Sequence, residues 1–258
     1  MQNETIQQYH KIDLSKNMLE SVPAYKLTTY SSIVSLNISW NRLLALRHDF
    51  SKNLPNLEVL DLSHNQISSI HSGSFSQAVR LTKIDLSSNM LKSISEEFFI
   101  DLLALRYLNL ASNQIAKIDP FSFTRQANLE LLSVADNQLR SISPQLSYLQ
   151  RGKLVLSGNP WVCDCDLLNF ERLWKKEALC SAENSSLKTD GQCELVTLDD
   201  LEKSREKWFR NRYPRLHFAD AASQSIIYLS GFITIVVLTT FVLQSILKKI
   251  SHKFFKKL

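Results

Sequence analysis

Four cysteines are the residues whose type and spacing most directly suggest chemistry: Cys163, Cys165, Cys180 and Cys193. A local, even-numbered group of cysteines is typical of disulfides formed in an oxidising compartment. A zinc site is the alternative, but one residue between Cys163 and Cys165 is poor spacing for a zinc finger. We therefore predict disulfides, and the residues by themselves leave every connectivity open.

The rest of the sequence lacks the patterns of a catalytic or cofactor-binding centre. The six histidines have no metal-ligand spacing, and the five glycines are too scattered for a phosphate-binding loop. The signature motifs of zinc proteases, serine hydrolases and nucleotide-binding loops are absent from the sequence. We expect no enzymatic activity, no metal, no cofactor and no small-molecule substrate.

The net charge of +5 reflects the end of the chain rather than a basic face. Five of the 30 basic residues lie in the last eleven positions, with no acid among them: Lys248, Lys249, Lys253, Lys256 and Lys257. The other basic residues are balanced by 25 acidic ones. We therefore expect no nucleic-acid partner. The tail either lies on anionic lipid or only flanks a membrane anchor.

An asparagine that recurs every 24 residues organises the chain before the cysteines. In the copy Leu57–Ile70, leucines stand eight, five and three residues before Asn65, and isoleucines two and five residues after it. The same pattern surrounds Asn17, Asn41, Asn89, Asn113 and Asn137, and a shortened copy ends at Asn159. A fixed period of this length predicts stacked structural repeats.

These residues, from Tyr9 to Asn159, resemble the leucine-rich repeat family in its 24-residue form. The L-x-L alternation predicts a short strand with one buried face, and the asparagine amide is expected to satisfy backbone groups inside the coil. Stacked coils bury leucines that one coil cannot bury. Phe75, Phe99 and Phe123 each follow their asparagine by ten residues and are expected to anchor the second half of the coil. The resemblance implies an α/β fold, a right-handed solenoid with a parallel concave sheet.

The concave sheet is the candidate surface for binding a protein, because solenoids use this surface for recognition. The alternation places one set of side chains outward, and most of that set is polar. The atypical members, which include exposed aromatic residues that favour interfaces, are Trp40, Val59, His64, Tyr107 and Leu131. Outward aspartates such as Asp61 are ordinary residues of the family and are expected to be solvated.

The stretch 159–196 resembles the C-terminal cap of extracellular leucine-rich repeat proteins. It reads Asn-Pro-Trp, then Cys-x-Cys, then an apolar helical pattern and two more cysteines. Such a cap covers the open apolar end of the last coil. The resemblance implies the disulfide pairs Cys163–Cys180 and Cys165–Cys193.

Three N-glycosylation sequons begin at Asn3, Asn37 and Asn184. Together with the cysteines, they indicate an outward location. Asn37 stands between the buried Leu36 and Ile38, so it is expected to point onto the concave face. A glycan there would cover part of that face near the second coil.

A transmembrane helix is predicted at residues 225–247. The stretch 226–247 has no charged residue and reaches about 33 Å as a helix, enough to cross a bilayer. Before it lies a membrane-proximal stalk at residues 197–224, where Thr197 and Asp200 form a capping pair that opens a helix. The basic tail at residues 248–258 follows it. The cysteines and sequons require the N-terminal side to be outside, so we expect a single-pass type I protein of the cell membrane.

Residues 1–8 show no signal peptide, and the repeats at residues 9–158 (six of 24 residues and one short copy) begin without a cysteine-bearing cap. We expect the N-terminus to be incomplete, or export to be driven by the transmembrane helix.

The most direct functional prediction is a cell-surface recognition or adhesion protein without a signalling domain. A first alternative rests on a layout similar to the leucine-rich auxiliary subunits of large-conductance calcium-activated potassium channels, which implies regulation through the helix and basic tail. A second alternative is a Toll-like receptor ectodomain without its signalling domain, as a truncated or decoy form.

Overall fold

The structure is a computed structural model that describes residues 10–22, 32–174 and 196–212. The chain divides into two compact units, residues 1–202 and residues 203–258. The first unit contains the repeats. The described part of the second unit is the end of one helix. The two units are described separately.

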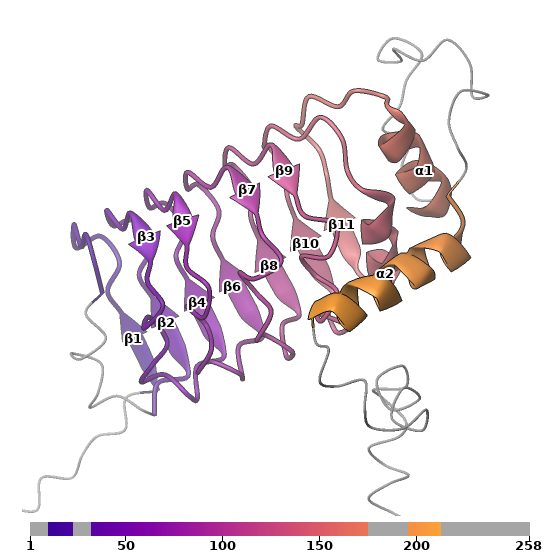
Figure 1. Cartoon of the computed structure of the whole chain (residues 1–258). Helices are drawn as coiled ribbons and strands as arrows, with labels where there is room; N and C mark the ends of the chain where they lie inside the picture. Colours follow the sequence, from indigo (N-terminus) through magenta and orange to yellow (C-terminus); the bar gives the residue numbers. More distant parts are fainter. Residues whose placement is uncertain (1–9, 23–31, 175–195, 213–258) are drawn as a thin grey trace, which may run out of the picture. The chain divides into compact units, whose positions relative to one another are not determined.

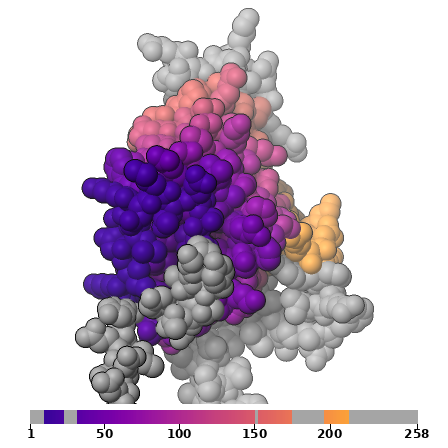
Figure 2. All heavy atoms as spheres, turned by 90° about the vertical axis from the view of Figure 1, so that its left-hand side faces the viewer, coloured from indigo at the N-terminus to yellow at the C-terminus, as the bar shows by residue number. Residues whose placement is uncertain are grey.

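Seven parallel strands form one sheet in the first unit, one strand for each asparagine copy (Figure 1). They are β1 (Lys11–Asp13), β2 (Ser35–Asn37), β4 (Val59–Asp61), β6 (Lys83–Asp85), β8 (Tyr107–Asn109), β10 (Leu131–Ser133) and β11 (Lys153–Val155). Their sequential order in the sheet confirms the predicted parallel solenoid. Figure 2 views the stack from its N-terminal end, where the indigo first coil lies in front of the later coils.

The register of the sheet follows the 24-residue period. Leu36 of β2 pairs with Leu60 of β4, which in turn pairs with Ile84 of β6. Equivalent residues of successive coils are therefore direct neighbours. Any side chain that repeats in the sequence repeats as a row on the surface of the solenoid.

Short strands also form along the other side of the coils, which the sequence did not predict. β3 (Ala45–Leu46) pairs with β5 (Ser69–Ile70), and β7 (Ser93–Ile94) pairs with β9 (Lys117–Ile118). In Figure 1 these strands lie apart from the seven-stranded sheet. They add backbone pairing between two pairs of neighbouring coils, after the turns at Asn41 and Asn65 and after those at Asn89 and Asn113.

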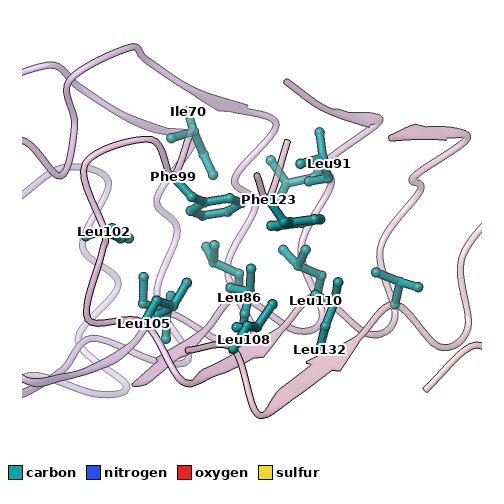
Figure 3. Packing of buried hydrophobic residues seen from close by; sticks show 14 of the residues in the cluster. Ile70, Leu86, Leu91, Phe99, Leu102, Leu105, Leu108, Leu110, Phe123 and Leu132 are labelled. Atoms are coloured by element: carbon teal, nitrogen blue, oxygen red, sulfur yellow. The ribbon is translucent and has the colours of Figure 1, made fainter. Parts of the chain in front are cut away.

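Leucines, isoleucines and one row of phenylalanines fill the interior of the coils (Figure 3). Leu60 and Leu62, on either side of the outward-facing Asp61, are almost fully buried. Phe99 is fully buried between Phe75 and Phe123, with ring centroids 6.0 Å away on each side. The predicted second-half anchors thus form a continuous aromatic row through three coils.

The sixth coil departs from the repeat. A 3-10 helix, η2 (Pro144–Arg151), replaces its second half, and the buried Ser147 stands where the three preceding coils carry phenylalanine. Helix α1 (Cys165–Trp174) packs against η2 and buries Phe170 and Trp174 against the core. Asp164 begins this helix, because its Oδ1 accepts a hydrogen bond of 2.8 Å from the backbone N–H of Leu167.

The cysteines of the predicted cap are only partly within the described residues. Cys163 is fully buried, and Cys165 is the first residue of helix α1. Cys180 and Cys193 lie outside the described residues. The two predicted pairs therefore stay predictions.

Helix α2 (Leu198–Arg212) begins in the first unit and ends in the second. The predicted capping pair is present: the Thr197 backbone N–H donates to Asp200 (2.9 Å), and the Asp200 N–H donates to Thr197 Oγ1 (3.2 Å). Within the part of the chain that the structure describes, no helix is both long and apolar enough to cross a membrane. The predicted transmembrane helix at 225–247, the tail at 248–258, Asn3 and Asn184 lie outside that part.

Candidate protein-binding face

The recurring asparagine fixes the turn at which each strand ends, and this turn positions the candidate face. Nδ2 of the buried Asn65 donates to the carbonyl of Leu62 in its own coil and to that of Ile38 in the preceding coil, both at 3.0 Å. Its Oδ1 accepts from the N–H of Leu43 at 3.1 Å. The same bonds repeat in the later coils, so the asparagines lock each coil to its predecessor and the predicted role of the amide is confirmed.

The polar residue at the centre of the outward strand face shapes the following turn. Oδ1 of Asp61 accepts the N–H of Ser63 at 2.9 Å, and Asp85 does the same for Ser87. In the first coil, the backbone hydrogen bond from Ser15 is the main cause that lowers the pKa of Asp13. Asp61 and Asp85 are half-buried, and each carboxylate accepts a hydrogen bond from the backbone of the following turn. Their role is therefore not limited to contact with solvent.

Three of the five predicted binding residues lie on the strands themselves. Val59 is on β4, Tyr107 is on β8, and Leu131 is on β10 as the register partner of Tyr107. Tyr107 is 40% exposed, while Val59 and Leu131 are half-buried. Lys83 occupies the same row between Val59 and Tyr107. The structure therefore brings Tyr107 and Leu131 together as an adjacent pair.

A charged network fixes the orientation of Tyr107. Its hydroxyl donates to Oε2 of Glu130 at 2.5 Å, and Oε1 of the same carboxylate forms a 2.6 Å ion pair with Arg106. The hydrogen bond to Glu130 is the largest cause that raises the pKa of the Tyr107 phenol above its ordinary value. This network restrains the Tyr107 side chain, the register neighbour of Leu131, before any ligand arrives.

Trp40 and His64 lie on the turns that follow the strands, and they contact each other directly. Their rings stack with centroids 3.9 Å apart and planes inclined by 15°. Both residues have left-handed backbone, with φ of 56° and 52°, and Trp40 is 55% exposed. A bulky residue in this conformation costs about 1–2 kcal/mol. The two residues form an exposed aromatic platform at the N-terminal end of the face.

The sequence could have revealed this stack. Trp40 and His64 each stand one residue before the asparagine of their coil, a position that has φ between 52° and 59° in the first six coils. Residues at one repeat position become neighbours when the coils stack. The period alone therefore places the two rings side by side, although not their plane-to-plane geometry.

A second exposed apolar row was missed by the sequence reasoning. It stands fourteen residues after successive asparagines, in the segments before the strands, and consists of Pro55, Val79, Leu103 and Ala127. Val79 and Leu103 are 55% and 49% exposed. The 24-residue spacing of these apolar loop residues in the sequence could have revealed the row.

Within residues 10–22, 32–174 and 196–212, no group of three His, Cys, Asp or Glu side chains could hold a metal ion. What this part of the chain offers is a polar sheet face with two exposed aromatic centres. Such a face is suited to binding.

Comparison with known proteins identifies the repeat. A leucine-rich repeat family model matches residues 31–91, 56–115, 79–139 and 104–160, which together span just over half of the chain. No curated protein matches the chain.

Solved structures share the fold. The TLR13 chain of a TLR13–ssRNA13 complex is 33% identical, with a TM-score of 0.51, over 53% of this chain and 20% of that chain. The leucine-rich repeat domain of APL1B is 24% identical (TM-score 0.52), over 59% of this chain and 45% of that chain. A leucine-rich repeat protein of Leptospira interrogans is 22% identical (TM-score 0.56), over 64% of this chain and 41% of that chain.

This chain thus spans less than half the length of each of these three structures. The similarity covers the repeats, where the asparagine ladder and the parallel sheet have been described. The chain belongs to the leucine-rich repeat family, whose domains generally serve as protein-binding scaffolds and typically are not enzymes.

Proposed function

We propose that this protein binds a protein partner at the cell surface through its sheet face. The observation that carries the proposal is the Tyr107–Leu131 pair, an aromatic and an aliphatic side chain in direct register on the outward side of the sheet. Aromatic residues that are rigidly held on a surface are frequent energetic centres of interfaces. The Glu130–Arg106 network supplies that rigidity for Tyr107.

The charges of the face favour a protein over a polyanion. Carboxylates of Asp61, Asp85 and Glu130 lie on or beside the strands, interspersed with Lys83 and Arg106. A mixed surface of this kind suits a partner with charges of both signs and repels a phosphate backbone at its acidic positions. We therefore do not propose RNA, which is named for the TLR13 complex, as a ligand of this chain.

The surface location is also part of the proposal. It is supported by the charge-free stretch at residues 226–247, by the group of cysteines between 163 and 193 and by the sequons. We propose a type I orientation, with the repeats outside and the five-lysine tail inside. The repeats of this chain would then recognise a partner outside the cell.

A decoy form related to Toll-like receptors is the second candidate. It is favoured by the 33% identity to TLR13 over 53% of the chain. The channel-subunit alternative depends on the helix and tail, which lie outside the described residues, and it stays a prediction.

Crosslinking on intact cells that express the tagged full chain tests the proposal. Tyr107→Ser and Leu131→Ser should each weaken capture of an extracellular partner by about tenfold or more, because interface centres often contribute 2 kcal/mol or more. Val79→Ser, in the second exposed row, is the matched control and should capture normally. If the Tyr107 and Leu131 variants capture the same partners as the unaltered chain at equal surface expression, the sheet face is not the binding site.

A crosslink that maps to residues 226–247 and joins a multi-span membrane protein would instead support the channel-subunit alternative. A crosslink to a Toll-like receptor ectodomain would support the decoy alternative.

A further inference from the structure

The side chains of the Trp40–His64 platform are larger than the turn of the repeat requires. Two later coils carry serine, Ser88 and Ser112, at the same position with the same left-handed backbone. A small polar residue therefore satisfies the turn. Trp40 adds a large indole that is 55% exposed, and one of its faces rests on the His64 ring. In the described part of the chain, neither ring has a hydrogen-bond partner. The platform has a free surface suited to an amphipathic ligand.

A potential ligand attachment point lies three residues earlier in the same coil. Asn37, on β2, begins the sequon Asn37-Ile38-Ser39. Its Oδ1 accepts the N–H of Ser39 at 2.9 Å, which fixes the orientation of the amide. Among the described residues, Nδ2 of Asn37 has no acceptor. The nitrogen that would carry a sugar is therefore left available.

Asn109 shows what the same position looks like without this arrangement. It occupies the equivalent place on β8, and its Oδ1 also accepts the N–H of the residue two positions later. Its Nδ2, however, donates to Oδ2 of Asp85 at 3.1 Å. The residue two positions later is Ala111, so no sequon exists, and the turn residue is Ser112 rather than an aromatic. The free amide, the sequon and the aromatic platform occur together at Asn37.

We propose that Asn37 carries an N-linked glycan whose first N-acetylglucosamine residues pack on the exposed indole of Trp40. The proposal rests on the surface location given under the proposed function, because the modification takes place in the secretory pathway. In the transfer, Nδ2 forms a bond to the anomeric carbon of a lipid-diphosphate oligosaccharide. The bond from that carbon to the diphosphate oxygen breaks, the lipid diphosphate leaves with the electron pair, and Nδ2 releases one proton.

The chemistry of the platform matches a sugar ring. One face of N-acetylglucosamine is lined by C–H groups that carry partial positive charge, and the face of an indole is electron-rich. His64 holds the indole in place from the side of the next coil. Asp13 and Asp61, the register partners of Asn37, offer carboxylate oxygens to hydroxyl groups. Apolar stacking beside hydrogen-bond acceptors suits a carbohydrate better than an aliphatic side chain.

The glycan would also define where a protein partner binds. It would cover the N-terminal end of the face around Trp40 and His64. The strands from β6 to β10, which carry Tyr107 and Leu131, would stay open. Trp40 would then serve the glycan and not the protein ligand.

Glycopeptide mass spectrometry and native deglycosylation test the inference on the full chain expressed in secreting animal cells. We expect Asn37 to be occupied. Peptide-N-glycosidase should release its glycan about fivefold faster from Trp40→Ser than from the unaltered chain, because one aromatic contact contributes on the order of 1 kcal/mol. Serine is the residue of Ser88 and Ser112, so the turn is preserved. His64→Ser should accelerate release in the same direction.

A matched control creates a glycan without a platform. Ala111→Ser places a sequon at Asn109, next to Ser112, and its glycan should be released as fast as the Asn37 glycan in Trp40→Ser. The inference is overturned if Asn37 is unoccupied in the unaltered chain. It is equally overturned if Trp40→Ser and the unaltered chain release the Asn37 glycan at the same rate.

The test separates this inference from the proposed function. Tyr107→Ser should weaken partner capture and leave the release rate at Asn37 unchanged, whereas Trp40→Ser should change the release rate. Occupancy of Asn184 without occupancy of Asn37 would place the chain in the secretory pathway and refute only the glycan platform. Absence of glycan at all three sequons would refute the surface location itself.

Discussion

Replacement of Asn113 tests how the asparagine ladder stabilises the solenoid. Its Nδ2 donates to the carbonyls of Leu86 (3.0 Å) and Leu110 (3.1 Å), and its Oδ1 accepts the N–H of Leu91 (3.0 Å). Each of the two carbonyls also accepts a bond from the asparagine of an adjacent coil. Asn113→Ala therefore removes the side-chain acceptor of one buried N–H but leaves neither carbonyl unpaired.

The expected loss of unfolding free energy follows from the hydrogen bonds that Asn113→Ala removes. An unpaired buried N–H costs about 1–3 kcal/mol, and two shared hydrogen bonds contribute less than two independent ones. We expect Asn113→Ala to lower the free energy of unfolding by about 2–4 kcal/mol. Asn17→Ala is the matched control, because exposed Asn17 makes one side-chain bond within the described residues, to the carbonyl of Ser15. Its loss should stay below about 1 kcal/mol.

Asn113→Asp should destabilise the protein more than Asn113→Ala at neutral pH, although it is the closer match in shape. The new carboxylate still accepts the Leu91 N–H, but its second oxygen faces the carbonyls of Leu86 and Leu110. Burial and these carbonyl dipoles raise the pKa of the new carboxyl in the folded state. The folded protein therefore binds more protons than the unfolded chain. The variant should be least impaired below the unfolded pKa of about 4 and lose stability as the pH rises through the folded pKa.

Urea unfolding followed by circular dichroism measures the free energies, and hydrogen exchange follows the Leu91 amide directly. Its protection should fall in Asn113→Ala more than the loss of global stability explains, and should be largely retained in Asn113→Asp at low pH. The reasoning is refuted if Asn113→Ala costs no more than Asn17→Ala, or if Asn113→Asp is more stable than Asn113→Ala at pH 8.

Three further outcomes follow from the structure. Phe99→Ala should lower the free energy of unfolding by about 3–5 kcal/mol in chemical denaturation, because it opens a cavity between two stacked phenylalanines; Phe99→Leu should cost less. Gly158→Ala should destabilise the last turn, since φ there is 70° and a Cβ would lie 2.0 Å from Oδ1 of Asp136. Thermal unfolding should show that adding Asp136→Ser to Gly158→Ala recovers part of the lost stability. Glu130→Gln should bring the raised pKa of Tyr107 back toward the ordinary tyrosine value, as followed by the phenolate absorbance, and an unchanged titration would show that the carboxylate is not the cause.

Much of the fold could be predicted because the repeat is nearly strict. The positions of Leu60 and Leu62 around Asp61 gave the strand and its buried side, and the 24-residue period gave the parallel register. Phe75, Phe99 and Phe123 were also predicted to anchor the second half of each coil, and they form a row because residues at one repeat position become neighbours. In a solenoid, residues that are one repeat apart in the sequence become neighbours in space, so the period of the sequence predicts tertiary contacts.

The candidate face was predicted only in part. The residues were correctly assigned to the outward side, but Tyr107 and Leu131 were not distinguished as a pair. The ion pair and hydrogen bond through Glu130 depend on side-chain conformations that no sequence pattern encodes. The turn-supporting role of Asp61 was missed because a polar residue on a strand face looks the same in a sequence whether it bonds to water or to the backbone.

The sequence by itself determined the repeat, its period, the buried positions and the polar character of the outward rows. Only the tertiary structure decided how the outward side chains meet. It placed the Trp40 ring flat on His64, left Nδ2 of Asn37 without an acceptor among the described residues, and joined that of Asn109 to Asp85. The physical reason is that burial follows from hydrophobic pattern, which is local and periodic. Ring orientation and amide pairing depend on distances of a few ångströms between coils, and these are set when the coils stack.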